Sequence, residues 1–415
     1  MSGLVKHYQN TMKGIPQLTN NWGAMITLLD AVLVTGFNYV SVVGLTKANA
    51  TSITATINLG SNHGFIDRQV VRIAGSTNGW DGDYKVLSVD GASITIECTA
   101  QHPSVILGTV TCFTAPLDFE IVYQTPADSI EPKRAYRSTD PESLGLILLV
   151  HDFCVSGASA TGAKFAKVGI VEGVDSNGNV IGNFMPFNSA TTNENWGWDG
   201  TYHGRAKWYY AAPNYDQTYD QFNDTVSPNA SNRIFTIAGD GISFSLAITN
   251  HQVHYLYGVA EFFDYAIQGQ NLMLAAASIN TNVAQSQGVR AVSRCALNVG
   301  LGNEALYGSN QNQRAMLWYN SAGLRIDTAL TRAVVIGYMA ISTSPTAITN
   351  SNTLYTQAPI IDSSNIFHGV MPFVRLQYGP RSGDNYTEDG LVRSYSHING
   401  GGYGTVNFGL SLEMK

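Results

Sequence analysis

The chain has 415 residues, more than a typical single domain, so we expect two or three domains. Charged residues make up only 13% of the chain, about half the usual share, and the net charge is −7 without a Lys/Arg cluster, which argues against direct binding to nucleic acid. A surface with so few charges would be a solubility risk for a free monomer. This composition therefore favours a surface that other subunits cover.

The first 36 residues are predicted to form an arm followed by a single helix. Residues 1–18 are polar, and we expect them to extend and dock onto a neighbouring subunit. Residues 21–35 are predicted to be helical, with Asn20 or Asn21 at the N-cap and Gly36 as the C′ glycine. The apolar side chains at helical spacing are Trp22, Met25, Ile26, Leu29 and Leu33.

No export signal is recognisable near the start of the chain. The longest apolar run, residues 24–34, contains Asp30 and is too short to cross a bilayer. We therefore expect a protein that is made in a cytoplasm, is not exported by the usual route and has no membrane-spanning segment.

Residues 37–115 are predicted to form a small antiparallel β-module. Short runs rich in Val, Ile, Thr and Tyr alternate with turn residues, which is typical of strands at 53–59, 69–73, 84–89 and 93–98. Asp90-Gly91 stands between the last two runs and predicts a hairpin. About 60 residues are few for an independent core, so we expect this barrel-like module to pack on its neighbours.

Residues 116–280 are predicted to form a β-sandwich or jelly-roll domain, and residues 281–415 a C-terminal β-rich domain or a continuation of the sandwich. Strands are expected at 117–123, 133–138, 144–153, 166–172, 233–237, 242–249, 254–260, 272–277, 290–297, 314–319, 331–341, 370–376 and 405–412. Residues 342–365 are polar and predict a surface loop, and residues 400–404 a flexible turn. The predicted fold class is mainly β, with one small N-terminal helix.

Several short motifs occur in a fixed order along the chain. In the β-module they are His63-Gly64-Phe65, Val70-Val71-Arg72-Ile73 and Asn78-Gly79-Trp80-Asp81-Gly82-Asp83-Tyr84. In this order they resemble a module that recurs in phage tail and baseplate proteins. Residues 5–38 resemble the N-terminus of virion proteins that carry the module, and segments 134–138, 196–198, 233–244 and 257–265 extend the resemblance to about residue 277. The resemblance implies a structural protein of the phage tail.

Two pairs of residues have the spacing of chemically active groups. His251 and His254 are three apart, but residues three apart on a strand face opposite ways, which argues against a shared metal ion. His151 and Asp152 could supply a base and its orienting partner, yet adjacent strand residues also point apart. We therefore predict no catalytic residue, no metal site and no cofactor site.

The remaining acids and the cysteines have structural interpretations. Asp81, Asp83 and Asp240 are predicted to be turn residues that bond their own backbone, with calcium binding as the weaker alternative. A glycosidase pair would need two carboxyl groups ~5–9 Å apart across a groove. The acids considered for such a pair are Glu120, Glu172 and Glu261. The four cysteines, predicted to be buried thiols, are Cys98, Cys112, Cys154 and Cys295, of which the first two could meet across strands.

Residues 194–210 are rich in aromatic side chains. The rings are those of Trp196, Trp198, Tyr202, Trp208, Tyr209 and Tyr210. Such rings can stack on sugars, or they can fill a core between two sheets. We favour the core, or a subunit interface.

The residues and the resemblance together predict a non-enzymatic structural component of a tailed-phage virion. We expect a homo-oligomeric ring in the tail, of the sheath or baseplate type, located in the virion after synthesis in the host cytoplasm. Its expected partners are copies of itself and other tail proteins, with a host surface glycan as a further candidate. The alternative is a host-recognition spike or fibre-associated protein that binds carbohydrate, and a third interpretation is a polysaccharide-degrading enzyme.

Overall fold

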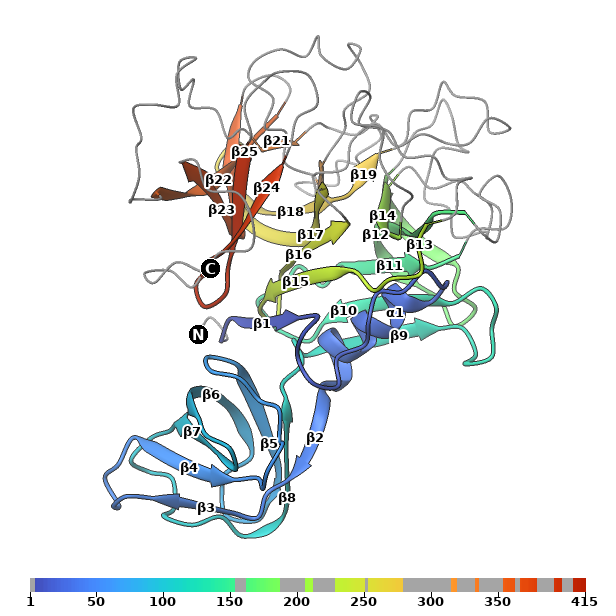
Figure 1. Cartoon of the computed structure of the whole chain (residues 1–415). Coiled ribbons are helices and arrows are strands. Elements are labelled where there is room, and N and C mark those ends of the chain that lie inside the picture. Colours follow the sequence, from blue (N-terminus) through green and yellow to red (C-terminus); the bar gives the residue numbers. More distant parts are fainter. Residues whose placement is uncertain are drawn as a thin grey trace, which may run out of the picture.

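The structure is a computed structural model that describes residues 4–153, 162–186, 206–211, 228–250, 253–278, 315–318, 333–335, 354–362, 366–378, 392–397 and 406–415. Within these ranges the chain is mainly β, with one short helical segment near the N-terminus, as predicted. Figure 1 shows a body of stacked sheets and, below it, the smaller β-module. The predicted strand at 290–297 and the turn at 400–404 lie outside the described residues.

The body contains three antiparallel sheets. The central sheet has the order β1-β15-β16-β17-β18-β20, from Lys6–Gln9, Ile234–Gly239, Phe244–Asn250, Val253–Asp264, Gly269–Ala275 and Ala315–Trp318. The outer sheet has the order β19-β14-β12-β11-β10-β9, from Ala277–Ser278, Ala206–Ala211, Lys164–Val174, Ile147–His151, Lys133–Ser138 and Phe119–Gln124, with β13 (Val180–Met185) paired to β12. The C-terminal sheet has the order β21-β22-β23-β25-β24, from Ala333–Val335, Leu354–Asp362, Phe367–Tyr378, Val406–Ser411 and Val392–His397.

The central sheet is buried on both faces. Successive strand residues face opposite sides, so Leu246 belongs to the core shared with the outer sheet, while the adjacent Ala247 belongs to the core shared with the C-terminal sheet. The face of the central sheet that packs on the C-terminal sheet carries small side chains, including Ala238 and Ala260. These allow the C-terminal sheet to approach closely. The predicted sandwich is therefore present, and a third layer is added to it.

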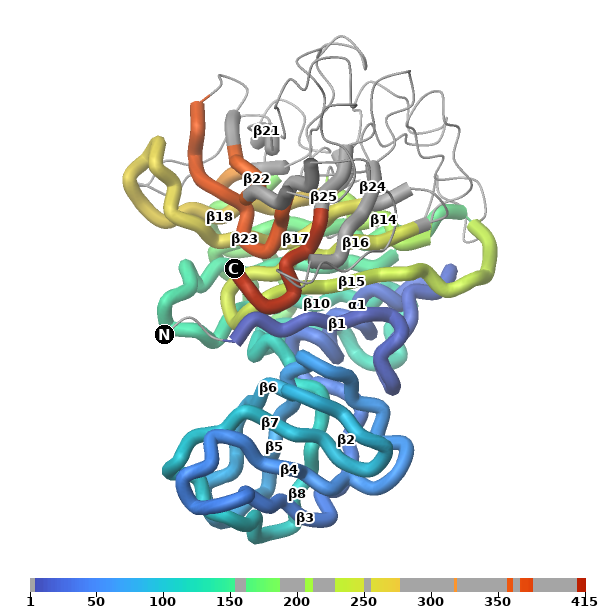
Figure 2. The backbone as a smooth tube through the Cα atoms, turned by 60° about the vertical axis from the view of Figure 1, so that its left-hand side comes forward, coloured from blue at the N-terminus to red at the C-terminus, as the bar shows by residue number. Residues whose placement is uncertain are grey.

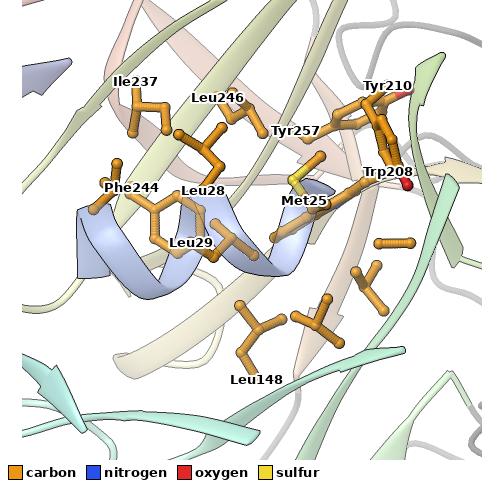
Figure 3. Packing of buried hydrophobic residues seen from close by; sticks show 14 of the residues in the cluster. Met25, Leu28, Leu29, Leu148, Trp208, Tyr210, Ile237, Phe244, Leu246 and Tyr257 are labelled. Atoms are coloured by element: carbon orange, nitrogen blue, oxygen red, sulfur yellow. The ribbon is translucent and has the colours of Figure 1, made fainter. Parts of the chain in front are cut away.

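The helical segment fills the space between the central and outer sheets. It consists of α1 (Ala24–Leu29) followed by the π-helix η1 (Asp30–Thr35). Figure 3 shows Met25, Leu28 and Leu29 packed among side chains of both sheets, including Phe244 and Leu148. The predicted helix is confirmed, and its apolar stripe is the face that it buries.

The two ends of this segment differ in how far they follow the prediction. Gly36 ends it at a φ of +75°, where an added Cβ would collide with the carbonyl of Thr114, so the predicted glycine is required. The predicted asparagine N-cap is wrong. Gly23 occupies the N-cap position, and the carboxylate of Asp152 accepts the backbone N–H groups of Met25 and Ile26 instead.

The N-terminal residues do not extend away from their own chain. Lys6–Gln9 forms β1 and pairs antiparallel with β15, and all four of its residues are buried. The Tyr8 hydroxyl donates to the carbonyl of Ala115 at 2.7 Å. The expected docking arm is therefore, over these residues, an edge strand of the central sheet.

The β-module is a curled seven-stranded sheet in the order β2-β8-β5-β6-β7-β4-β3. Its strands are Phe37–Ser41, Gly108–Thr114, Val70–Ser76, Gly82–Val89, Ser93–Glu97, Thr54–Asn58 and Gly44–Lys47. β2 runs almost directly into β3, and the two pair with β8 and β4 respectively, so the sheet curls around its own apolar core. The module is barrel-like, without forming a closed barrel.

Two local predictions in these sheets had opposite outcomes. The hairpin at Asp90-Gly91 is present, with the Asp90 N–H donating to the Ser93 carbonyl at 2.9 Å. The prediction of a surface loop at 342–365 is wrong for its second part, because Leu354–Asp362 forms strand β22, which lies between two other strands of the C-terminal sheet. Polar composition suggested a loop there, but Ala358 and Ile360 face the core.

Candidate functional site

Asp152 and His151 do not act on each other. Asp152 is fully buried and faces the helix; its Oδ1 lies 2.6 Å from the Tyr210 hydroxyl, and its Oδ2 accepts the Met25 N–H at 2.9 Å. Burial raises the pKa of Asp152 to about 7, against the opposing effect of these hydrogen bonds. His151 lies opposite Lys133 and Lys167 on neighbouring strands of the outer sheet. The expectation that the two side chains point apart agrees with these contacts.

The three candidate glutamates lie on different strands, and each has its own structural partner. Glu120 pairs with Arg137 at 2.7 Å, and Glu172 accepts the side-chain amide of Asn183 at 2.8 Å. Glu261 is buried on β17 and binds the loop before β11, accepting the Ser143 hydroxyl at 2.7 Å. Burial raises the pKa of Glu261, although the hydrogen bond from Ser143 opposes that rise. None of these contacts joins two of the three.

Two of the three candidate aspartates are turn residues, as predicted. The Asp81 carboxylate accepts the Ser76 N–H at 2.7 Å, and Asp240 accepts the Ser243 N–H at 2.8 Å within its hairpin. The turn prediction is wrong for Asp83, whose carboxylate pairs with Arg72 on the neighbouring strand, with Nε–Oδ1 at 2.5 Å. Sequence alone did not show which side chain would face it across the sheet.

Asp83 belongs to a charged junction that joins the module to the body and consists of Lys6, Arg72, Asp83 and Asp118. Arg72 also binds both carboxylate oxygens of Asp118 at 2.7 Å, and Lys6 lies 2.6 Å from Asp83. Burial alone would raise the pKa of Asp118, but hydrogen bonding to Arg72 and the charge of Lys6 outweigh it and lower that pKa. The junction therefore holds β1, the module and the start of the body together.

The described part of the aromatic-rich stretch is core. Trp208, Tyr209 and Tyr210 on β14 are fully buried, and Trp208 donates to the carbonyl of Ala275 at 2.8 Å. Figure 3 shows Trp208 and Tyr210 beside Tyr257 of the central sheet. The core interpretation is confirmed for these three residues, while Trp196, Trp198 and Tyr202 lie outside the described residues.

An exposed aromatic surface lies elsewhere, at the β17–β18 hairpin. We call it the hairpin platform and define it by Phe263, Tyr265, Ile366 and Phe367. Their side chains are 44%, 56%, 48% and 44% exposed, respectively. The Tyr265 and Phe367 rings are nearly parallel, at 24° with centroids 5.8 Å apart, and Phe263 meets Tyr265 edge-on at 5.2 Å.

Buried polar groups beneath the platform fix its shape. Asp264 is fully buried, and its Oδ2 lies 2.7 Å from His368 Nδ1 and accepts the side-chain amide of Asn271 at 2.7 Å. The Tyr265 N–H donates to the His368 carbonyl at 2.7 Å, which ties the hairpin to β23. Sequence analysis missed this surface. The available signal was Phe263 and Tyr265, two aromatic residues on either side of a turn-forming aspartate.

The described cysteines and the other possible metal ligands form no further site among the described residues. Cys98 and Cys112 are buried free thiols, as predicted, and Cys154 and Cys295 lie outside the described ranges. In the ranges that the structure describes, no group of three His, Cys, Asp or Glu side chains could hold a metal ion. His251 and the side chain of His254 are not among them. No described helix is long and apolar enough to span a membrane.

Comparison with known proteins gives a distant structural likeness. No protein-family model matches the chain, and no curated protein matches it. Among solved structures, the chain is similar to a phage phi92 endosialidase, at 12% sequence identity and a TM-score of 0.17. The match covers 89% of this chain and 61% of that one, so the chain spans less than two thirds of its neighbour. A TM-score this low carries no argument about function.

Proposed function

We propose that this chain is a non-enzymatic structural protein of a tailed-phage virion, which forms a homo-oligomeric ring in the tail. The virion assignment is supported by the ordered motifs that resemble phage tail and baseplate proteins, from His63-Gly64-Phe65 onward. The ring is proposed to be of the sheath or baseplate type. Its partners would be copies of the chain and other tail proteins.

The observation that carries the proposal of assembly is the apolar surface of the β-module. Eight large apolar side chains of the module are exposed: Tyr39, Val43, Ile53, Ile66, Leu87, Val89, Val105 and Leu107. Val43 is 71% exposed at the bend between β2 and β3, and Val105 bridges to Thr46 just beyond that bend. Single exposed apolar residues are ordinary, but eight of them on one small module of a chain with 13% charged residues favour an interface.

The position of the module suits this role. Figure 2 shows that the module projects from the body, so its far surface is open to a neighbouring subunit. The charged junction fixes its orientation, because Arg72 binds Asp83 within the module and Asp118 at the start of the body. A permanent ring contact would bury upward of ~2,000 Å² with an apolar centre.

The proposal is tested by the mass of the purified protein, measured by light scattering after size-exclusion chromatography. We expect a discrete hexamer or larger ring, and we expect Val43→Glu to shift it toward monomer because it places a charge in the proposed interface. Ile130→Glu is the matched control, since Ile130 is 79% exposed but lies in the body. A monomer at all concentrations, or a ring that Val43→Glu leaves intact, would contradict the proposed interface.

One observation favours the alternative, a host-recognition protein that binds carbohydrate. The hairpin platform presents aromatic rings to solvent on the body, away from the module. A compact trimer in the same measurement would favour this alternative over a tail ring.

A further inference from the structure

We propose that the hairpin platform is a binding site for a neutral oligosaccharide. The inference goes beyond the structural role, because ring assembly through the module does not require the platform. It rests on three properties of the surface: exposed aromatic rings, a rigid support, and flanking segments (residues 261–270 and 366–369) without Lys or Arg.

The ring geometry suits stacking on a sugar. The Tyr265 and Phe367 rings lie within 24° of parallel with centroids 5.8 Å apart, which is an offset stack, and each side chain remains about half exposed, so the pair presents apolar ring surface to solvent. The apolar C–H face of a pyranose can stack on such rings, while the Tyr265 hydroxyl provides a polar end that stays in water. Phe263, which meets Tyr265 edge-on, extends the apolar surface.

The support beneath the rings lowers the entropic cost of binding. Asp264 accepts the Ala266 N–H at 2.9 Å in addition to its contacts with His368 and Asn271, so the turn between Phe263 and Tyr265 is held at several points. Gly369 brings β23 so close that an added Cβ would lie 2.7 Å from a ring carbon of Phe262. A ligand therefore meets rings that are already ordered, which reduces the free energy spent on fixing them.

The charge around the platform selects the class of sugar. Within residues 261–270 and 366–369 the ionisable side chains are Glu261, Asp264, Tyr265 and His368, and both acids and the histidine are buried. The exposed polar side chains of the hairpin include the neutral amides Gln268 and Gln270. These two segments offer no Lys or Arg to pair with an acidic sugar, whereas amides and a hydroxyl can hydrogen-bond the hydroxyl groups of a neutral one.

The size of the platform argues against a second protein as its occupant. Three aromatic side chains of about 200 Å² each, roughly half exposed, offer about 300 Å². A standard protein interface takes about 800 Å² from each partner. An open site of this size predicts weak binding, with a Kd on the order of 1 mM per site, which several copies in an oligomer would strengthen by avidity.

The test is saturation-transfer NMR on the full chain with three neutral hexasaccharides: maltohexaose, cellohexaose and mannohexaose. Hexagalacturonate serves as the anionic comparison. Tyr265→Ala and Phe367→Ala are expected to weaken binding of the neutral probe at least about fivefold, and Tyr265→Phe is expected to retain most of it because the ring remains. Ile181→Ala is the matched control, since it removes a comparably exposed apolar side chain from β13 of the body, outside both the platform and the module.

Folding of each variant is checked by its urea unfolding midpoint. Binding of a neutral hexasaccharide that Tyr265→Ala weakens and Ile181→Ala does not would support the site. Binding of none of the neutral probes, binding of hexagalacturonate alone, or equal binding by Tyr265→Ala would overturn it. A loss of oligomer mass in Tyr265→Ala with unchanged sugar binding would also overturn it, by identifying the platform as a contact between copies. The mass of the wild-type protein tests the tail-ring proposal independently.

Discussion

Replacing Asp152 tests whether a remote carboxyl group holds the only described α-helix in place. Asp152 lies 127 positions from Met25, yet its Oδ2 accepts the Met25 N–H at 2.9 Å and the Ile26 N–H at 3.4 Å. Asp152→Ala leaves both buried donors without this acceptor. An unsatisfied buried donor costs about 1–3 kcal/mol, and the longer Ile26 bond counts for less, so we expect a loss of about 2–4 kcal/mol.

Asp152→Asn is expected to behave quite differently, because the geometry indicates a neutral carboxyl group. The Tyr210 hydroxyl lies 2.9 Å from the Asn21 carbonyl and 2.6 Å from Asp152 Oδ1, but it has only one proton to donate. A protonated Asp152 can donate to Tyr210 while Tyr210 donates to Asn21, which satisfies all three groups. An asparagine can reproduce this arrangement, with its oxygen toward Met25 and its amide toward Tyr210.

The pH dependence follows from the direction of the shift. The pKa of Asp152 is raised by burial from 3.8 to about 7 in the folded protein. Below pH 3.8 both states are protonated and the stabilising contribution is fully present. As the pH rises to about 7, only the unfolded state loses its proton, so stability falls by up to about 1.4 kcal/mol per pH unit, roughly 4 kcal/mol in all.

The assay is urea unfolding at several pH values between 4 and 8, with near-ultraviolet circular dichroism as the signal that reports unfolding. The quantity of interest is the free energy of unfolding of the wild type minus that of Asp152→Asn. In this difference the contributions of all other titrating groups cancel. This difference should be near zero at pH 4 and should fall as the pH rises, until the asparagine variant is the more stable protein. A difference that rises with pH would show that the folded protein holds Asp152 ionised with a lowered pKa, and would refute the reasoning.

Three further predictions concern the β-module. Arg72→Met should destabilise the module–body junction by about 2 kcal/mol, since it leaves Lys6 as the one junction cation for the two carboxylates of Asp83 and Asp118. Faster proteolysis between the module and the body would show it, and an unchanged rate would count against the junction. Gly75→Ala should lower the stability of the module by more than about 1 kcal/mol in urea unfolding, because Gly75 has a φ of +90° and an added Cβ would collide with the Thr109 carbonyl. The Cys112 thiol is fully buried and its pKa is raised by burial, so a thiol reagent at pH 8 should modify it only after unfolding; rapid modification of the native protein would contradict this.

Sequence predicted elements well where the information is local. The predicted strand at 133–138 coincides with β10, Lys133–Ser138, and the turn at Asp90-Gly91 forms the hairpin between β6 and β7. In both places, alternation and turn residues within a few positions determine the structure. Gly36 was predictable for the same reason, because a glycine with a positive φ commonly ends a helix.

The missed features depend on partners that are distant in the chain. β1 exists because Lys6–Gln9 finds an edge in β15, more than 200 residues later, and nothing in four mostly polar residues indicates that edge. Asp83 looked like a turn residue until the sheet placed Arg72 opposite it. The hairpin platform needed β17 and β23 to come together, so that Tyr265 and Phe367 share one surface.

Asp152 shows why a perturbed acid must be interpreted from its contacts. A carboxyl group with a pKa near 7 beside a histidine in the sequence has the properties of an acid–base catalyst. Here Oδ1 contacts Tyr210 and Oδ2 accepts N–H groups of the helix, so both oxygens bind the protein itself. Because strand residues alternate between the two faces of a sheet, His151 faces away from this cluster. The same burial that raises the pKa of Asp152 places it where it can hold a helix between two sheets, and a loss of stability on its removal is the result that this arrangement predicts.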